Sequence, residues 1–204
     1  MEALTLVKRL AIIGGGIEQI RAYQIAKEMG LNIVGTDMNP SAPALRYADD
    51  QVIVSTRDAQ KTAEMLFQFH QKNPIDGVIG IAVDIPVTIA SVANKLGLFG
   101  LSPESARLAA NKFFMKEVFK TNFINVPFFQ QIHTLQELQQ TIALIGFPAV
   151  IKPVDNCGAR GVLRITQQTD LTWAFEYSKK FSFCGEVIIE KFLDGIQIST
   201  ESMI

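Results

Sequence analysis

The chain has 204 residues, of which 48% are hydrophobic and 19% are charged, as in soluble globular proteins with a buried core. Lys and Arg number 19 against 20 Asp and Glu, so no basic excess indicates a nucleic acid or an anionic membrane as partner. No apolar run reaches the roughly 20 residues that span a bilayer. The two cysteines have neither CxxC nor metal-site spacing, and we expect a reduced, cytoplasmic protein.

Strand and helix signals alternate through the first half of the chain. Short apolar runs next to glycines or turn residues predict buried strands, and apolar residues at helical spacing predict helices between them. The predicted strands are residues 9–13, 32–37, 51–54 and 77–81, and the predicted helices are 17–29, 58–69 and 86–96. This alternation is typical of a doubly wound parallel α/β sheet, so we predict a Rossmann-like domain over residues 1–101.

The second half has a different order of elements. Ser102 and Pro103 form a helix start, and the helical pattern over 102–125, with a break near Asn111, predicts a connection between two units. Later strands are predicted at 128–132, 149–152, 162–165 and 187–190, and helices begin at the capping box Thr134–Glu137 and at Asp170. We therefore predict a small α+β unit over residues 126–195.

Residues 196–204 have the pattern of a further strand, and the chain ends on two apolar residues. Chain ends are more often polar and frayed. We expect the first strand of a truncated C-terminal subdomain here. The alternative is a strand that a partner chain completes, and in both cases an exposed pairing edge makes a homodimer possible.

A first glycine cluster, Gly14 to Gly16, lies between a predicted strand and a predicted helix, where backbone N–H groups can face an anion. Asp37 ends the next strand, as in a dinucleotide fingerprint. Gln19 occupies the position of the last glycine in GxGxxG, however, so the match is weak. The cluster is either a tight turn without a ligand or a small-molecule site at the carboxyl edge of the sheet.

Four residues near this edge are candidates for contacting a substrate: Gly15, Gly16, Glu18 and Asp84. Asp84 could equally cap the helix that follows it. Glu18 also fits a solvated acid in the first turn of a helix. His70 and His133 have no partner pattern and are predicted to lie at the surface.

A second glycine cluster follows Lys152, which ends an apolar strand. The loop contains Gly158 and Gly161 and leads into another strand, so its backbone can approach a phosphate closely. Lys152 would add a point charge to the same phosphates. The alternative is a hairpin loop beside a solvated lysine, which the apolar context of Lys152 disfavours.

A third feature is the apolar strand 187–190, which ends in Glu190 and runs into a loop with Gly195. An adenine ring needs an apolar slot and a few polar groups that match its edge. Glu190 and the main chain after it would supply such groups. A solvated strand end explains the same pattern, so this feature is weak by itself.

Lys112, Lys152 with its glycine loop, and the run from Glu190 to Leu193 occur in an order and spacing that resembles the ATP-grasp enzymes. This family includes biotin carboxylase, the large subunit of carbamoyl phosphate synthetase and purine-biosynthesis ligases. The resemblance covers nearly the whole chain. It implies that the Rossmann-like domain precedes an ATP-grasp fold, of which 126–195 is the lid subdomain and 196–204 the start of the next.

The resemblance implies a phosphate site. Lys112 would contact the nucleotide phosphates from the connecting helix, and Lys152 would contact the α- and β-phosphates. The backbone of the glycine loop would cover them, through Gly158, Ala159 and Gly161.

The same resemblance implies a site for the nucleoside. Glu190 would accept a hydrogen bond from the adenine amino group, and the main chain of Lys191 and Leu193 would meet the ring edge. Gln197 stands where the family commonly has an acid or a histidine for the ribose hydroxyls. An amide can also bond a hydroxyl, so binding is retained in principle.

The family's reaction implies the cofactors and substrates. ATP phosphorylates a carboxylate, an amine (or a thiol) attacks the acyl phosphate, and Mg²⁺ neutralises the transferring group. The magnesium ligands are expected downstream of Ile204, so no metal ligand or catalytic residue is assigned and the chain alone is expected to be inactive. The alternatives are an NAD(P)-binding oxidoreductase domain and a non-catalytic nucleotide-binding module.

Overall fold

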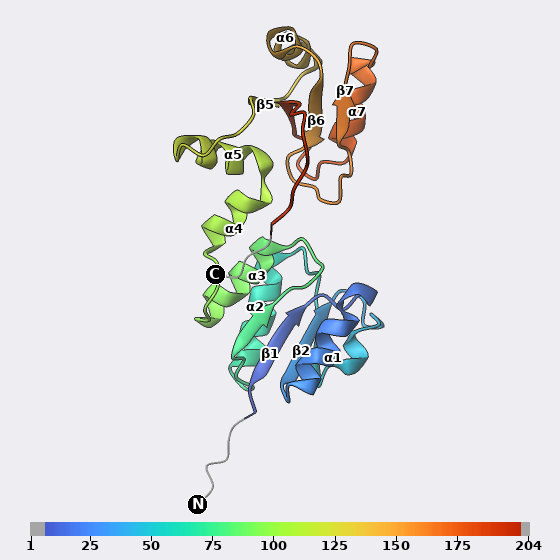
Figure 1. The fold of residues 1–204 in the computed structure, drawn as a ribbon. Coiled ribbons are helices and arrows are strands. Elements are labelled where there is room, and N and C mark those ends of the chain that lie inside the picture. Colours follow the sequence, from blue (N-terminus) through green and yellow to red (C-terminus); the bar gives the residue numbers. More distant parts are fainter. Residues whose placement is uncertain (1–6, 201–204) are drawn as a thin grey trace, which may run out of the picture. The chain divides into compact units, whose positions relative to one another are not determined.

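A computed structural model describes residues 7–200 and divides the chain into two compact units, Met1–Ala110 and Asn111–Ile204 (Figure 1). The division lies at the break between two helices, within the connection that the sequence predicts over 102–125. No helix in the described part of the chain is long and apolar enough to cross a bilayer.

The first unit contains the predicted parallel α/β sheet. Its strands are β1 (Arg9–Ile13), β2 (Asn32–Asp37), β3 (Asp50–Ile53) and β4 (Gly77–Ile79), in the order β3-β2-β1-β4, and all pairs are parallel. The last strand ends two residues earlier than predicted. The carbonyls of Ile81 and Ala82 accept hydrogen bonds from the side chain of Gln19, so this segment belongs to a loop and not to the sheet.

Helices cover both faces of this sheet (Figure 1). They are η1 (Ile17–Gln19), α1 (Ile20–Glu28), η2 (Leu45–Tyr47), α2 (Ala59–His70) and α3 (Pro86–Leu96), and α4 (Pro103–Ala110) packs on α3. Because side chains alternate along a strand, Ile12 packs with Tyr23 of α1 on one face. Its neighbour Ala11 packs with Leu66 of α2 on the other face. The result is three layers with a core on each side of the sheet.

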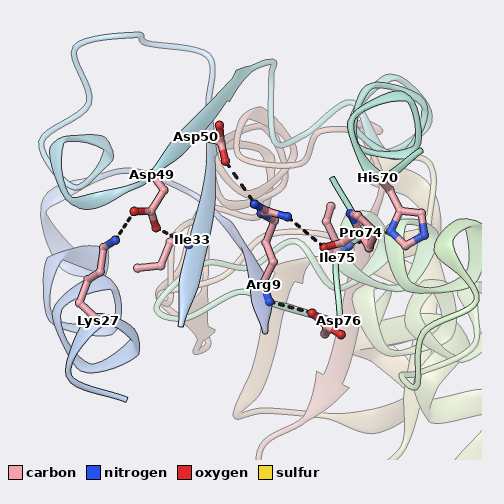
Figure 2. A network of polar contacts seen from close by, with 9 residues as sticks. All are labelled: Arg9, Lys27, Ile33, Asp49, Asp50, His70, Pro74, Ile75 and Asp76. Carbon is pink, nitrogen blue, oxygen red and sulfur yellow. Dashed lines mark hydrogen bonds and ion pairs between the residues drawn. The ribbon is translucent and has the colours of Figure 1, made fainter. Parts of the chain in front are cut away.

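A polar network fixes the amino ends of the strands (Figure 2). The N–H of Arg9 donates to Asp76 Oδ2 at 2.7 Å, and its guanidinium donates to the carbonyl of Pro74 at 3.3 Å. His70 Nδ1 accepts from the N–H of Ile75 at 2.9 Å, so this half-buried histidine has a structural partner. Ligands of open α/β sheets bind at the opposite, carboxyl edge, so we assign these contacts to stability.

The second unit contains a four-stranded antiparallel sheet with the order β5-β8-β6-β7, which agrees with the predicted α+β fold. Helices α6 and α7 pack on one face, where they enclose an apolar core. The elements are α5 (Lys112–Thr121), β5 (Phe129–Ile132), α6 (Leu135–Ile145), β6 (Ala149–Pro153), β7 (Leu163–Ile165), α7 (Leu171–Lys180) and β8 (Val187–Lys191).

The predicted helix starts are confirmed by their capping bonds. Thr134 Oγ1 accepts from the N–H of Glu137 at 3.1 Å, and the Glu137 carboxylate accepts from the N–H of His133 at 2.7 Å. Asp58 and Asp170 cap α2 and α7 in the same way. Local hydrogen bonds of this kind are encoded by a few consecutive residues, which explains why the sequence predicts them.

The strand predicted from residue 196 onward does not form over residues 196–200, and residues 201–204 lie outside the described part of the chain. Ile196 and Ile198 are 94% and 81% exposed. A strand is stable only when a neighbouring strand pairs with its backbone, and none lies beside this segment in the described residues. The apolar pattern therefore predicted an element whose pairing partner the described chain lacks.

Candidate functional site

The register of the antiparallel sheet brings Lys152 and Glu190 to one face. Ala149 and Ile151 of β6 point into the core beneath α6 and α7, so Val150 and Lys152 point to the opposite face. Val150 pairs directly with Glu190 of β8, which places Lys152 diagonally across from the carboxylate. Two residues predicted from separate motifs thus meet.

The Glu190 carboxylate is enclosed by charged groups. Glu190 is only 6% exposed, and its Oε1 lies 2.8 Å from Lys152 Nζ. Its Oε2 lies 3.4 Å from Nζ of Lys116 on α5. The contact at Oε1 is an ion pair without hydrogen-bond geometry, so this buried oxygen keeps a lone pair for a donor. Lys152 is held by a partner, which rules out the solvated lysine of the alternative interpretation.

A cleft of about 740 Å³ opens beside this ion pair. Ligand pockets typically measure about 300–1,000 Å³ and combine apolar walls with a few polar groups. The cleft brings together five of the nine residues predicted to bind a nucleotide. Its lining consists of Pro127, Val150, Lys152, Glu190, Lys191, Phe192, Leu193, Asp194, Gly195, Ile196, Gln197 and Ile198.

Lys191 contributes to this cleft through its main chain. Its Nζ donates to the carbonyl of Ile145 at 2.7 Å, at the end of α6, so the charged end is used within the fold. Its N–H donates to the carbonyl of Phe128 at 2.9 Å. The carbonyl of Lys191 and the main chain of Leu193 are the groups that we expect to meet a ligand.

The glycine loop between β6 and β7 lies outside the cleft lining, as does Lys112. Gly158 and Ala159 have positive φ angles of 63° and 57°. Gly161 has φ of 75°, and a Cβ there would lie 2.8 Å from both Phe181 Cβ and Pro153 Cγ, so only glycine fits. Lys112 Nζ donates to the carbonyl of Asn156, which joins α5 to the start of this loop.

Two residues that the sequence did not single out anchor the loop. The Asp155 carboxylate accepts from Ser182 Oγ at 2.8 Å and from the N–H of Cys184 at 2.7 Å, and Asn156 Nδ2 donates to the carbonyl of Phe181 at 2.6 Å. Burial alone would raise the pKa of the Asp155 carboxyl, but the hydrogen bonds that it accepts from Ser182 and Cys184 outweigh burial and hold the pKa below its ordinary value. Asp and Asn directly before a glycine loop are a usable sequence signal for such anchoring.

The first glycine cluster is filled by the protein's own groups. The N–H of Gly15 donates to Asp37 Oδ2 at 2.9 Å, and Asp37 Oδ1 accepts from the N–H of Asn39 at 2.9 Å. Gln19 is buried beside the cluster. Each oxygen of Asp37 therefore accepts a hydrogen bond from the chain's own backbone, which fixes the carboxylate beside the cluster.

The remaining substrate candidates lie at the surface of the first unit. Glu18 and Asp84 are exposed, and Gly16 is half-buried. Asp84 does not cap α3, because the N-cap residue is Ile85 and no side chain bonds the first turn. Within residues 7–200, no group of three or more His, Cys, Asp or Glu side chains is arranged to hold a metal ion.

Comparison with known proteins finds a matching family model for each unit. The model of the PylC-like N-terminal domain matches residues 10–92, and that of the phosphoribosylglycinamide synthetase ATP-grasp (A) domain matches residues 110–204. The phosphoribosylamine–glycine ligase of Pyrococcus furiosus is 28% identical over 201 residues, which is 95% of this chain and 44% of that protein. The carbamoyl phosphate synthase large chain of Thermomicrobium roseum is 23% identical over 94% of this chain and 19% of its own length.

Solved structures share the fold. N5-carboxyaminoimidazole ribonucleotide synthetase from Thermotoga maritima superposes with a TM-score of 0.66 and 26% identity, over 91% of this chain and 46% of that one. Carboxyaminoimidazole ribonucleotide synthase from Aspergillus clavatus, complexed with ATP, gives a TM-score of 0.73 and 21% identity, over 92% and 47%. The chain thus spans less than half the length of these relatives. With one family match on each unit and these relatives along nearly its whole length, the chain belongs to the ATP-grasp superfamily.

Proposed function

We propose that this chain is the nucleotide-binding portion of an ATP-dependent ligase that joins a small carboxylate to an amine or a thiol through an acyl phosphate. The observation that carries the proposal is the cleft in which Glu190 and Lys152 meet beside the loop that follows β8. The named activities of the relatives, which are ligases, synthases and synthetases, support the same class of reaction.

The residues of the cleft fit ATP. The buried Oε1 of Glu190 is suited to accept from the adenine amino group, because no hydrogen bond of good geometry uses it. Val150 and Leu193 supply apolar surface for the ring, and Gln197 supplies an amide for the ribose hydroxyls. Bound ATP would supply the phosphoryl group that activates a carboxylate, with Mg²⁺ neutralising its charge.

Lys152 and the glycine loop would hold the phosphates. Lys152 is part of the cleft, and an ammonium group stabilises phosphate oxygens as a point charge. We propose that Lys112 reaches the phosphates from α5 and that the backbone of Gly158, Ala159 and Gly161 covers them. The positive φ angles of this loop are the kind that turn successive N–H groups toward an anion.

The substrate would bind at the carboxyl edge of the parallel sheet. We propose that Gly16, Glu18 and Asp84 contact it, since each is at least partly accessible there. Gly15 would act through its position alone, because its N–H is bonded to Asp37. Small, polar carboxylates and amines match this description.

The test is calorimetric titration of the chain with Mg²⁺–ATP and, separately, with NAD. We expect ATP to bind and Lys152→Ala to weaken it about tenfold or more, since a charged contact to phosphate is lost. Lys180→Ala, which removes an exposed charge from α7, is the matched control and should bind like the wild type. Binding of NAD without ATP, or equal ATP affinity in Lys152→Ala, would overturn the proposal.

A further inference from the structure

Lys116 is a charged residue in a buried position that the proposed function leaves without a role. It lies on α5, one turn after Lys112, and is 9% exposed. Its Nζ lies 3.4 Å from Glu190 Oε2 and 5.9 Å from the centre of the Phe129 ring. A buried ammonium is costly unless a nearby group compensates its charge, and here Glu190 does so.

Glu190 is shared between two lysines. Lys152 approaches one carboxylate oxygen at 2.8 Å and Lys116 the other at 3.4 Å, so two positive charges surround one negative charge. A single lysine would suffice to neutralise the carboxylate. The second ammonium therefore leaves one positive charge that can be directed to another anion without leaving Glu190 unpaired.

The position of each lysine decides which one is free to turn away. Lys152 lines the cleft, whereas Lys116 does not and is held against the sheet near Phe129, which pairs directly with Glu190. A phosphate entering the cleft can thus reach Lys152. Breaking a buried ion pair by removing one partner is strongly destabilising when the other charge is left alone.

We propose that Lys116 is a positioning residue, a reserve counter-ion that keeps Glu190 neutralised when Lys152 turns from the carboxylate to the phosphates of a bound nucleotide. This inference rests on the proposed function. It makes Lys116 act on the phosphate end of the ligand through Glu190, without contact to the nucleotide. Ligands without phosphates do not require Lys152 to move, so they should not depend on Lys116.

The experiment compares the affinities for Mg²⁺–ATP and for adenosine in the wild type, Lys116→Met and Lys116→Arg. In Lys116→Met the carboxylate retains Lys152 alone, so we expect ATP to bind about tenfold or more weakly while adenosine binds as before. Lys116→Arg keeps the charge and should restore ATP affinity. Lys120→Met is the control, because it removes a charge from the exposed face of the same helix, also 5.9 Å from the Phe129 ring.

A double-mutant cycle with Glu190→Gln separates this role from packing. The Glu190→Gln amide carries no negative charge to compete with a phosphate for Lys152, so Lys116→Met should change ATP affinity in this protein by less than about twofold. An equal loss for ATP and adenosine, or the same ATP loss in the Glu190→Gln protein, would mean that Lys116 serves only to pack α5. A wild type that binds neither ligand would instead overturn the proposed function, and the counter-ion role with it.

Discussion

At the scale of single residues, two glycines of the same loop make different demands on their surroundings. Gly158 and Gly161 both have positive φ angles, which cost an L-residue about 1–2 kcal/mol. A Cβ at Gly158 would meet nothing within 4 Å, whereas one at Gly161 would collide with Phe181 and Pro153. The atoms that it would meet are the Cβ of Phe181 and ring carbons of Pro153, and neither can move without a shift of the backbone.

We predict that Gly161→Ala lowers the free energy of unfolding of the second unit by about 2 kcal/mol or more, since backbone strain and overpacking add. Gly158→Ala should lower it by only about 1 kcal/mol, from the backbone term alone. Urea unfolding followed by fluorescence measures both, because the one tryptophan, Trp173, lies on α7 of this unit. Equal losses in the two variants would contradict the close packing at Gly161.

Asp155 should make the free energy of unfolding depend on pH in the acidic range. Its pKa is lowered in the folded protein from an ordinary value of 3.8. The stabilisation by the carboxylate is therefore complete above about pH 4 to 5 and is lost as the pH falls through the lower, folded pKa. Asp155→Asn should be less stable than the wild type at pH 7, and the difference should shrink toward about pH 2. The free energies of unfolding of the two proteins are measured by urea unfolding followed by Trp173 fluorescence. A difference between them that stays constant across this pH range would exclude this titration.

At the scale of elements, the end of α5 contains a left-handed residue that is not glycine. Phe123 has φ of 59° and is 96% exposed. The N–H of Phe123 donates to the carbonyl of Lys120 at 3.1 Å, and the N–H of Ile124 donates to that of Phe119 at 2.9 Å. This is the Schellman pattern, in which the left-handed position usually holds glycine or asparagine.

We predict that Phe123→Asn raises the free energy of unfolding by about 0.5–1 kcal/mol, because asparagine adopts this conformation with little strain. Phe123→Ala is the matched control: it removes the same exposed ring but keeps the strained Cβ, so it should give no comparable gain. Denaturant unfolding monitored at Trp173 compares the two. A similar gain in both variants would assign the effect to the lost ring.

Elements were predictable from sequence where their causes are local. Apolar runs located the strands, and the caps at Asp58, Thr134 and Asp170 located helix starts, because each depends on a few consecutive residues. The ion pair between Lys116 and Glu190 was missed because its partners are far apart in sequence and meet only through the packing of α5 on β5. The spacing of Lys112 and Lys116, which places both on one helix face, is the one local signal for it.

At the scale of the whole molecule, large apolar side chains in both units are exposed almost completely. Phe99 is 100% exposed and Ile196 is 94% exposed. Contacts between such groups on different molecules remove apolar surface from water. We therefore predict self-association that increases with concentration, and less of it after combined serine substitution at Phe99, Phe123 and Ile196. Sedimentation velocity at low and high concentration measures this, and a monomer throughout would contradict it.

The order of strands and helices along the chain predicted a parallel α/β unit followed by an α+β unit. The cleft was predictable only in part. Lys152 and Glu190 were predicted from motifs and Gln197 from the resemblance to the ATP-grasp enzymes, and all three line it. Asp155 directly before the glycine loop is a local signal for anchoring, but its partners lie in the loop after α7, far along the chain, so the contacts themselves could not be predicted. Tertiary contacts, and not residue types, decided which polar groups became part of the site.

The alternation of side chains along β6 has a consequence for how faithfully the second unit folds. Lys152 faces the cleft only because Ile151 faces the core, and a shift of one residue against β8 would exchange them. The shifted sheet would place an ammonium among apolar groups, which is costly. The charged side chains that we propose to bind the nucleotide therefore also favour the correct strand alignment, because each is stable only on the face that lines the cleft.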